Sequence, residues 1–164
     1  MLASAGLMAF LGTWEGNGQN TVYADKLAKG LPTVCKGITR FVSPYPLVVG
    51  DYWSDERCAE VEQMVVTKGQ LALADCITNE KVAQNTFDSL TSHSHNVGVP
   101  STCASRAVGL INAGRIEEGC KAIAWAEDGV TPVWAFVTDA GGIKRFVPGL
   151  HNRRLAEMKL CLTP

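Results

Sequence analysis

Residues 13–39 read TWEGNGQNTVYADKLAKGLPTVCKGIT, and two kinds of structure meet in this stretch. Residues 2–15 carry a single charge and are otherwise mostly apolar, which predicts a short helix that ends at Gly16. From there to about residue 53, short β-prone pieces alternate with glycine and proline, which predicts a small antiparallel sheet. Glu15 is therefore expected at the end of an apolar helix, directly before the sheet.

The remainder of the chain has mostly helical periodicity. Ser54 suits the N-cap of a helix over residues 55–76, because Asp55 and Glu56 in the first turn favour the positive end of the helix dipole. Further helices are predicted at 80–92, 101–113, 115–126 and 150–161. The segment between Asp128-Gly129 and Gly141-Gly142 is predicted as a looser stretch, and short strands are expected at 21–23, 33–35, 38–42 and 47–49. These elements predict an α+β fold.

Length and composition indicate one globular domain. The chain has 164 residues, of which 46% are hydrophobic and 19% charged, and these values exclude the disordered and fibrous classes. The net charge is −1 and no basic run occurs, so we expect no nucleic-acid partner. The predicted domain covers 1–164, with a β lobe at about 16–53, a helical lobe formed by 1–15 and 54–164, and a ligand cleft between the lobes.

Six cysteines are many for a chain of this length, and no two of them are close in sequence. They are Cys35, Cys58, Cys76, Cys103, Cys120 and Cys161. Zinc sites usually contain a close pair, so a metal site is not expected. The even number fits three disulfides in an oxidising compartment, and six buried free thiols in a cytosolic protein are the alternative. Spacing alone leaves all 15 pairings open.

The first thirteen residues carry no charge. This run is shorter than the ~20 residues of a spanning helix and lacks the basic residues that begin a signal peptide. Two interpretations stay open: an ordinary first helix, or the end of a trimmed export or anchor segment.

Six short motifs occur in an order that resembles the phage lysozyme family, which includes the lambdoid endolysins. They are TWEG at 13–16, YAD at 23–25, TVCKGIT at 33–39, NVG at 96–98, NAG at 112–114 and GLHNRRLAE at 149–157. The resemblance implies a lysozyme-like fold and hydrolysis of the β-1,4 bond between N-acetylmuramic acid and N-acetylglucosamine in peptidoglycan. It further implies host cell lysis from the periplasm, no cofactor, a monomer and, in some members, a membrane tether through an N-terminal segment. It also suggests the pairing Cys35–Cys58, Cys76–Cys103 and Cys120–Cys161.

The resemblance assigns chemical roles to three residues. Hydrolysis of a glycoside needs one carboxylic acid to protonate the leaving oxygen and a second carboxylate. The apolar surroundings of Glu15 favour its protonated form and make it the general acid, whereas Asp25 in a polar turn stays ionised as the base. By resemblance, Thr33 positions the attacking water. The alternatives are a solvated helix end for Glu15, a turn cap for Asp25 and a plain strand residue for Thr33.

Three further residues are expected at the substrate. Asn96 and Gly98 either contact the glycan and brace the cleft or simply end a helix. Arg153 is preferred to Arg154 as the cation near the catalytic glutamate, and the alternative for both is a solvated helix face. His93 and His95 form only half a metal site.

Two rival functions stay open. A lytic transglycosylase needs one acid and no water, and the presence of Asp25 and Thr33 argues against it. A non-catalytic peptidoglycan-binding protein is favoured only by the spacing of nine residues between Glu15 and Asp25, because many family members have fewer.

Overall fold

The computed structural model describes residues 4–16, 18–26 and 28–164. It forms two compact units, the sheet unit (Met8–Lys68) and the helical unit (Met1–Leu7 with Gly69–Pro164). Helices α1 (Ala5–Glu15) and α2 (Asp55–Ala74) each contribute residues to both units. The sheet unit therefore takes in more of the chain than the predicted β lobe at 16–53.

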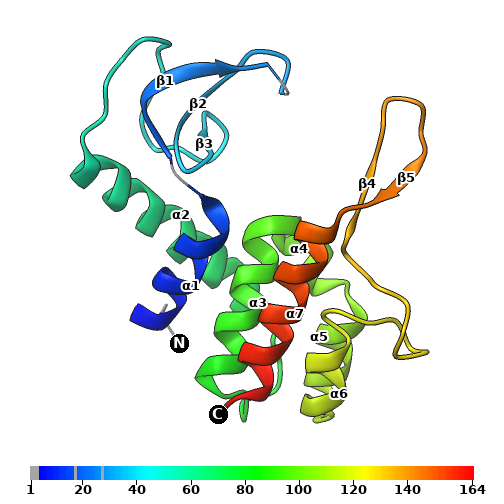
Figure 1. The fold of residues 1–164 in the computed structure, drawn as a ribbon. Coiled ribbons are helices and arrows are strands. Elements are labelled where there is room, and N and C mark those ends of the chain that lie inside the picture. Colours follow the sequence, from blue (N-terminus) through cyan, green and yellow to red (C-terminus); the bar gives the residue numbers. More distant parts are fainter. Residues whose placement is uncertain (1–3, 17, 27) are drawn as a thin grey trace. The chain divides into compact units, whose positions relative to one another are not determined.

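The sheet unit contains three antiparallel strands in the order β1-β2-β3 (Figure 1). The strands are β1 (Gln19–Asp25), β2 (Leu31–Cys35) and β3 (Ile38–Thr39). The hydrophobic core of this unit is formed by residues of the sheet, of α2 and of the segment between them, namely Val22, Val34, Cys35, Ile38, Trp53, Cys58 and Val61. The strand predicted at 47–49 is wrong: this segment has no strand structure, and β1 instead pairs with the following residues through the bridge between Thr21 and Tyr52.

Helix α2 begins as the sequence predicts. The backbone N–H of Arg57 donates to the Ser54 Oγ at 3.2 Å, so Ser54 satisfies one of the exposed donors of the first turn. Among the described residues, no helix combines the length and apolar character that crossing a bilayer requires.

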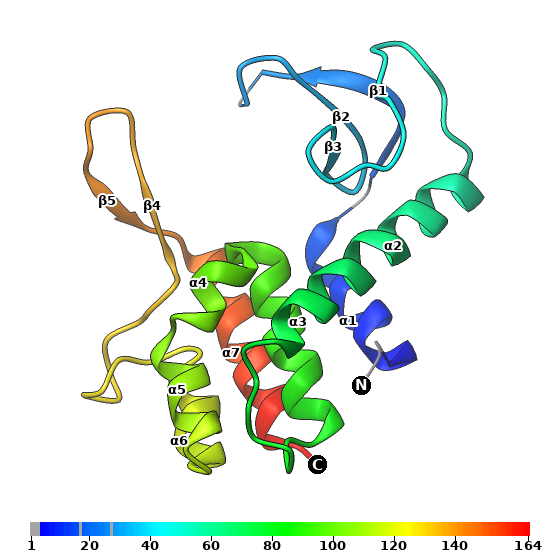
Figure 2. The same ribbon diagram turned by 180° about the vertical axis from the view of Figure 1, so that it is seen from behind.

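The helical unit contains a group of five helices. They are α3 (Gln84–Val97), α4 (Val99–Cys103), α5 (Arg106–Asn112), α6 (Ile116–Lys121) and α7 (Pro148–Leu162). Helices α3 and α7 lie side by side in two opposite views (Figures 1 and 2). Their hydrophobic core includes Leu73, Phe87, Leu90, Ile111 and Ile123, all of them buried.

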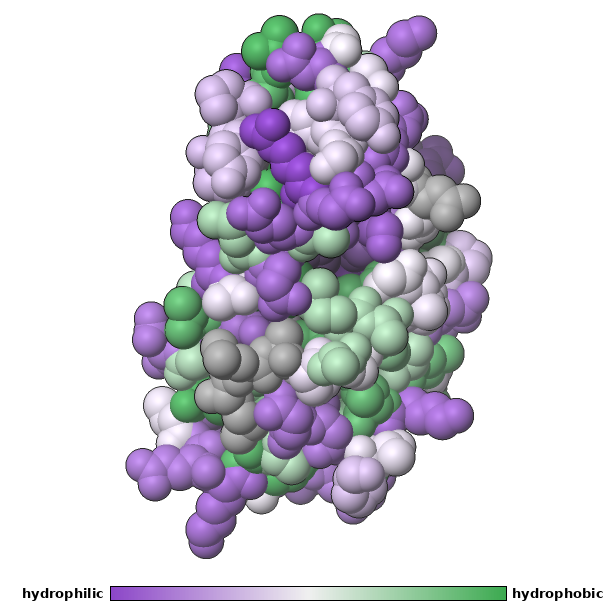
Figure 3. Space-filling view, turned by 90° about the vertical axis from the view of Figure 1, so that its left-hand side faces the viewer, coloured by the Kyte–Doolittle hydropathy of each residue, from purple (hydrophilic) through white to green (hydrophobic). Residues whose placement is uncertain are grey.

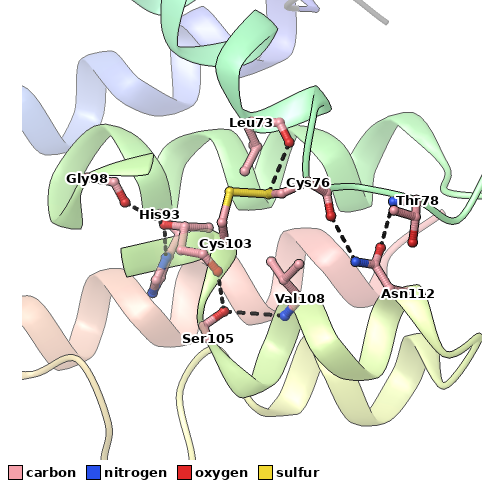
Figure 4. The surroundings of a disulfide bond; sticks show 10 residues. Leu73, Cys76, Thr78, His93, Gly98, Cys103, Ser105, Val108 and Asn112 are labelled. Carbon is pink, nitrogen blue, oxygen red and sulfur yellow. Dashed lines mark hydrogen bonds between the residues drawn. A yellow bond between two sulfur atoms is a disulfide. The ribbon is translucent and has the colours of Figure 1, made fainter. Parts of the chain in front are cut away.

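Two predictions for the helical unit need correction. The helix predicted at 101–113 is two helices, because the Ser105 hydroxyl accepts the Val108 N–H at 3.3 Å and starts a new helix there (Figure 4). The loose stretch contains an antiparallel hairpin of β4 (Phe136–Thr138) and β5 (Lys144–Phe146). Three-residue strands are too short to give a readable alternation of polar and apolar residues.

One disulfide lies within the sheet unit and two lie within the helical unit, and the pairing suggested by the resemblance is confirmed. Cys35–Cys58 joins β2 to α2, Cys76–Cys103 joins the turn after α2 to α4, and Cys120–Cys161 joins α6 to α7. Figure 4 shows Cys76–Cys103 beside Leu73. Next to it, the Asn112 side chain donates to the Cys76 carbonyl at 2.8 Å and accepts the Thr78 N–H at 2.9 Å. Asn112 therefore holds the turn after α2.

One face of the molecule is largely hydrophilic, with hydrophobic residues in smaller areas between (Figure 3).

Candidate active site

Glu15 is the last residue of α1, where the sequence places it. Gly16 follows with a φ of +69°, a left-handed conformation that ends the helix and that glycine adopts without strain. Glu15 is half-buried, and so is Trp14, whose ring lies 6.3 Å from that of Phe10 one turn earlier. The carboxylate is thus set between an apolar helix and the entry to the sheet.

Asp25 ends β1 at the turn into β2. Its backbone carbonyl accepts the N–H of Ala28 at 3.1 Å and of Gly30 at 2.7 Å, so hydrogen bonds fix the turn at its base. The side chain is half-buried. Asp25 therefore lies in a polar turn, as the sequence predicts.

Asp25 and Thr33 share one face of the sheet. The register pairs Asp25 with Leu31 and Tyr23 with Thr33 across β1 and β2. Because side chains alternate along a strand, this face is opposite the one on which Val34 faces the hydrophobic core. The pairing thus brings the Asp25 carboxylate and the Thr33 hydroxyl onto the same face, because Asp25 is two residues from Tyr23, the partner of Thr33.

The Thr33 hydroxyl has a defined orientation. Thr33 is only 3% exposed, and its Oγ1 donates to the Leu31 carbonyl at 3.0 Å. Its proton is used in this bond, so the oxygen is oriented as an acceptor.

Gly98 is where α3 gives way to α4, and its role in the fold is clear. Its φ is +94°, and its N–H donates to the Ser94 carbonyl at 2.8 Å, which closes α3. Asn96, two residues earlier, is exposed. Gly98 therefore ends α3, and substrate contacts by Asn96 and Gly98 stay predictions.

Arg153 and Arg154 are both buried, contrary to the solvated-face alternative. Arg153 is 5% exposed and donates to the Ser92 carbonyl at 3.1 Å, and Arg154 Nε forms an ion pair with Glu157 Oε2 at 2.8 Å. Arg153 Nε lies 3.2 Å from Glu157 Oε1, which also accepts from the Ser92 hydroxyl at 2.7 Å. Burial raises the pKa of Glu157 and lowers that of Arg154. A role for Arg153 near Glu15 stays a prediction.

His93 lies within the electrostatic influence of this charged cluster, and its role was not predicted from the sequence. It is 1% exposed, and its Nδ1 lies 2.8 Å from the Thr102 Oγ1 (Figure 4). Burial, with help from the charges of Arg154 and Arg153, lowers the pKa of His93 from 6.5 to about 3. Its ring meets that of Trp134 edge to face at 5.2 Å. The imidazole is therefore neutral and acts as a packing element.

The sheet unit also contains a polar pocket of about 630 Å³. It is lined by Gly12, Thr13, Gly16, Gly18, Asn20, Lys36, Asp55, Ala59, Glu62 and the Cys35–Cys58 disulfide. The pocket thus adjoins the end of α1 without including the three candidate catalytic residues in its lining.

The chain is similar to known proteins over nearly its whole length. Residues 12–157 match the family described as Phage lysozyme. A protein of Pseudomonas phage phiKMV, described as a SAR-endolysin, is 35% identical over 99% of this chain and 87% of its own length.

Solved structures share the architecture. The endolysin from Escherichia coli O157:H7 phage FAHEc1 superposes with a TM-score of 0.79 at 28% identity, over 99% of this chain and 93% of its own. The muramidase domain of SpmX from Asticaccaulis excentricus has the same TM-score at 21% identity, over 98% and 97% of the two chains, and supports the fold alone.

Proposed function

The chain belongs to the phage lysozyme family, and from this membership we propose that Glu15 is the general acid of its active site, Asp25 the general base and Thr33 the residue that positions water. The chain is a glycoside hydrolase of lysozyme-like α+β fold that acts on bacterial peptidoglycan. The predictions of family, fold class and enzyme class are thus confirmed.

The proposed reaction is a hydrolysis with inversion at the muramic acid C1. The protonated carboxyl of Glu15 gives its proton to the glycosidic oxygen as the bond from C1 to that oxygen breaks. A water held by the Thr33 Oγ1 attacks C1 from the other side of the sugar ring, and Asp25 accepts its proton. The products are two glycan ends, and one water is consumed.

One observation carries this assignment. The β1–β2 register places Asp25 and Thr33 on the same face of the sheet, opposite the face of the core residue Val34. The Thr33 proton is already used in the bond to the Leu31 carbonyl, so the oxygen suits a water that donates to it. Glu15 ends α1 in the same unit of the structure.

The test is the clearing of purified Gram-negative peptidoglycan by wild type and Glu15→Gln side by side. We expect a loss of at least about 100-fold in rate, the lower end of what a general acid contributes. Glu60→Gln, at an exposed position of α2 in the same unit, is the matched control and should keep wild-type activity. Equal rates for wild type and Glu15→Gln would contradict the assignment.

The same digest separates hydrolysis from transglycosylation. A lytic transglycosylase leaves an anhydro sugar that is lighter by one water, so the mass of the released disaccharide peptides decides between the two reactions. We expect only the hydrated product. An Asp25→Asn variant should lose activity as well, because the hydrolysis needs a second carboxylate as base. A transglycosylase has no need of that carboxylate, so the same variant of a transglycosylase would stay active.

We also propose that the protein acts in the periplasm, as a monomer. Three disulfides suit an oxidising compartment, and the phiKMV relative is described as a SAR-endolysin. A membrane-tethered form of the protein is part of this proposal. Fractionation of expressing cells into membrane and periplasmic pools, with gel filtration of the released protein, tests it.

A further inference from the structure

The hairpin of β4 and β5 exposes two aromatic rings side by side. Phe136 and Phe146 are paired directly across the two strands, and their ring centroids lie 5.7 Å apart. Their side chains are 37% and 47% exposed. The Nζ of Lys144, on the same face, lies 5.7 Å from the centre of the Phe136 ring. We call these three residues the hairpin ring face.

Rings beneath the hairpin ring face tie it to the helices. Phe146 lies 5.7 Å from the ring of His151 on α7, and His151 meets Trp125 edge to face at 4.8 Å. Figures 1 and 2 show the hairpin projecting beyond α7, the helix that contains His151. The two phenylalanines are therefore the exposed end of a series of ring contacts that continues through His151 to Trp125.

The hairpin is held in shape by polar contacts at both ends. At the tip, the Asp139 carboxylate accepts the Ile143 N–H at 2.9 Å and pairs with Arg145 at 2.7 Å. These hydrogen bonds hold the pKa of Asp139 below its ordinary value. At the base, the Val147 N–H donates to the carbonyl of the fully buried Ala135 at 2.8 Å. A surface fixed before binding loses little conformational freedom when a ligand arrives.

We propose that the hairpin ring face binds the glycan strand of peptidoglycan, at sugar units held by the helical unit. This inference rests on the proposed function for the identity of the ligand. Each pyranose ring has a flat face of C–H groups that matches an aromatic ring, while its hydroxyls stay in water. The lactyl and stem-peptide carboxylates of the strand complement the charge of Lys144.

The size of the surface favours a glycan over a protein partner. A stable protein interface covers about 800 Å² on each side, with many side chains. Two half-exposed phenyl rings and one ammonium group fall well short of that area, and they match one or two sugar units. The register also places Val137 and Arg145 on the opposite face of the hairpin. Val137 is 47% exposed and so offers a matched control on the same strand.

The first measurement is binding of an N-acetylglucosamine tetrasaccharide to wild type, Phe136→Ser/Phe146→Ser and Val137→Ser. We expect the double variant to bind at least about fivefold more weakly, the loss typical of a ring at the centre of a contact, and Val137→Ser to bind like wild type. On peptidoglycan, KM should rise in the double variant while kcat stays unchanged. Equal affinity of the double variant and wild type would overturn the proposal.

Two further readouts keep the outcome decisive. If the double variant does not fold, the aromatic NMR signals of wild type replace it: the tetrasaccharide should shift those of Phe136 and Phe146 and leave those of Phe41, 72% exposed in the sheet unit, in place. Unshifted signals of Phe136 and Phe146 would contradict the proposal. Binding of wild type and the double variant to anionic lipid vesicles is measured as well. A double variant that loses vesicle binding but keeps glycan binding would also contradict the proposal. Tetrasaccharide binding without hydrolysis of peptidoglycan would refute the proposed function and leave the hairpin ring face supported.

Discussion

His93→Asn should make the protein less sensitive to acid, although it removes a buried ring. The Thr102 hydroxyl donates to the Gly98 carbonyl at 3.0 Å, so the contact between Thr102 and His93 must run from the imidazole Nδ1–H to Thr102 Oγ1. An asparagine amide has an N–H at the same place and keeps this bond. It cannot take up a proton in the same pH range.

The sign and size of the effect follow from the buried position of His93. Its pKa is about 3 in the folded protein and 6.5 in the unfolded chain, so the folded state favours the neutral ring. The contribution to stability is complete above pH 6.5 and is lost as the pH falls from there towards 3, because the unfolded chain binds the proton first. Each pH unit in this window lowers the free energy of unfolding by about 1.4 kcal/mol, so about 2 kcal/mol of stability is lost by pH 5.

Urea unfolding at pH 7 and pH 5 measures this term. We expect His93→Asn to be less stable than wild type at pH 7 by about 1–3 kcal/mol, from lost packing. Between pH 7 and pH 5, however, wild type should lose about 2 kcal/mol more than the variant. The raised pKa of Glu157 changes stability with pH in the opposite direction. Because Glu157 is present in both proteins, its contribution largely cancels in the difference between them.

Asn96→Ala is the control, since it changes an exposed residue without a titratable group on the same helix. It should keep the pH dependence of wild type. If wild type and His93→Asn lose the same stability between the two pH values, the imidazole is not held neutral by burial, and the electrostatic account of the cluster is wrong.

Two other perturbations test the packing of the helical unit. Replacing Cys120 and Cys161 by Ser opens a loop with a sequence separation of 41, and the gain in chain entropy should lower the free energy of unfolding by about 4 kcal/mol. Thermal unfolding under oxidising conditions measures this loss. An unchanged midpoint would mean that the bridge does not constrain the unfolded chain. Gly119→Ala would place a Cβ 2.5 Å from a side-chain carbon of α5 and should lower the free energy of unfolding by about 1–3 kcal/mol, whereas Gly109→Ala, with open space around its Cβ, should raise it by up to about 1 kcal/mol. Similar urea midpoints for the two glycine variants would contradict this close approach.

The sequence predicted those parts of the fold that depend on local signals. The end of α1 at Gly16 and the start of α2 at Ser54 both follow from capping chemistry, and both are confirmed. The split at Ser105 was missed, although serine is a good N-cap, because helical periodicity continues on both sides of it. Local propensity cannot tell a cap from an interior serine when no glycine or proline marks the break.

The candidate site was predicted in part for a similar reason. The positions of Glu15 at a helix end and of Asp25 at a turn are local properties, and the structure has both. The shared face of Asp25 and Thr33 depends on strand register, which the sequence does not specify without knowing how the turn between β1 and β2 closes. Their catalytic roles rest on the family and stay proposals.

The motif at residues 149–157 shows where reading a sequence by periodicity fails. Arg153, Arg154 and Glu157 are charged, and charged residues on a helix usually face water. Here all three are buried, because α3 supplies Ser92 to the same carboxylate, and Ser89 donates to the Glu157 backbone carbonyl at 2.6 Å. The Ser92 side chain is small enough to lie beside Arg153 and donates to Glu157, while Arg154 pairs with Glu157, so the arrangement requires both helices.

The same cluster explains why a histidine is tolerated inside the helical unit. Two guanidinium groups on α7 disfavour a third positive charge, and burial disfavours any charge on His93. A neutral imidazole can still donate to Thr102 and pack against Trp134, so it joins α3 to α4 and to the segment that leads into the hairpin. Trp134 adopts a left-handed conformation with a φ of +55°, which is costly for a bulky residue, and this contact offsets part of that cost. Protonation of His93 would therefore weaken its contact with Trp134, which supports the hairpin, as well as the packing of the helices. We expect acid that destabilises the helical unit to disturb the hairpin ring face too.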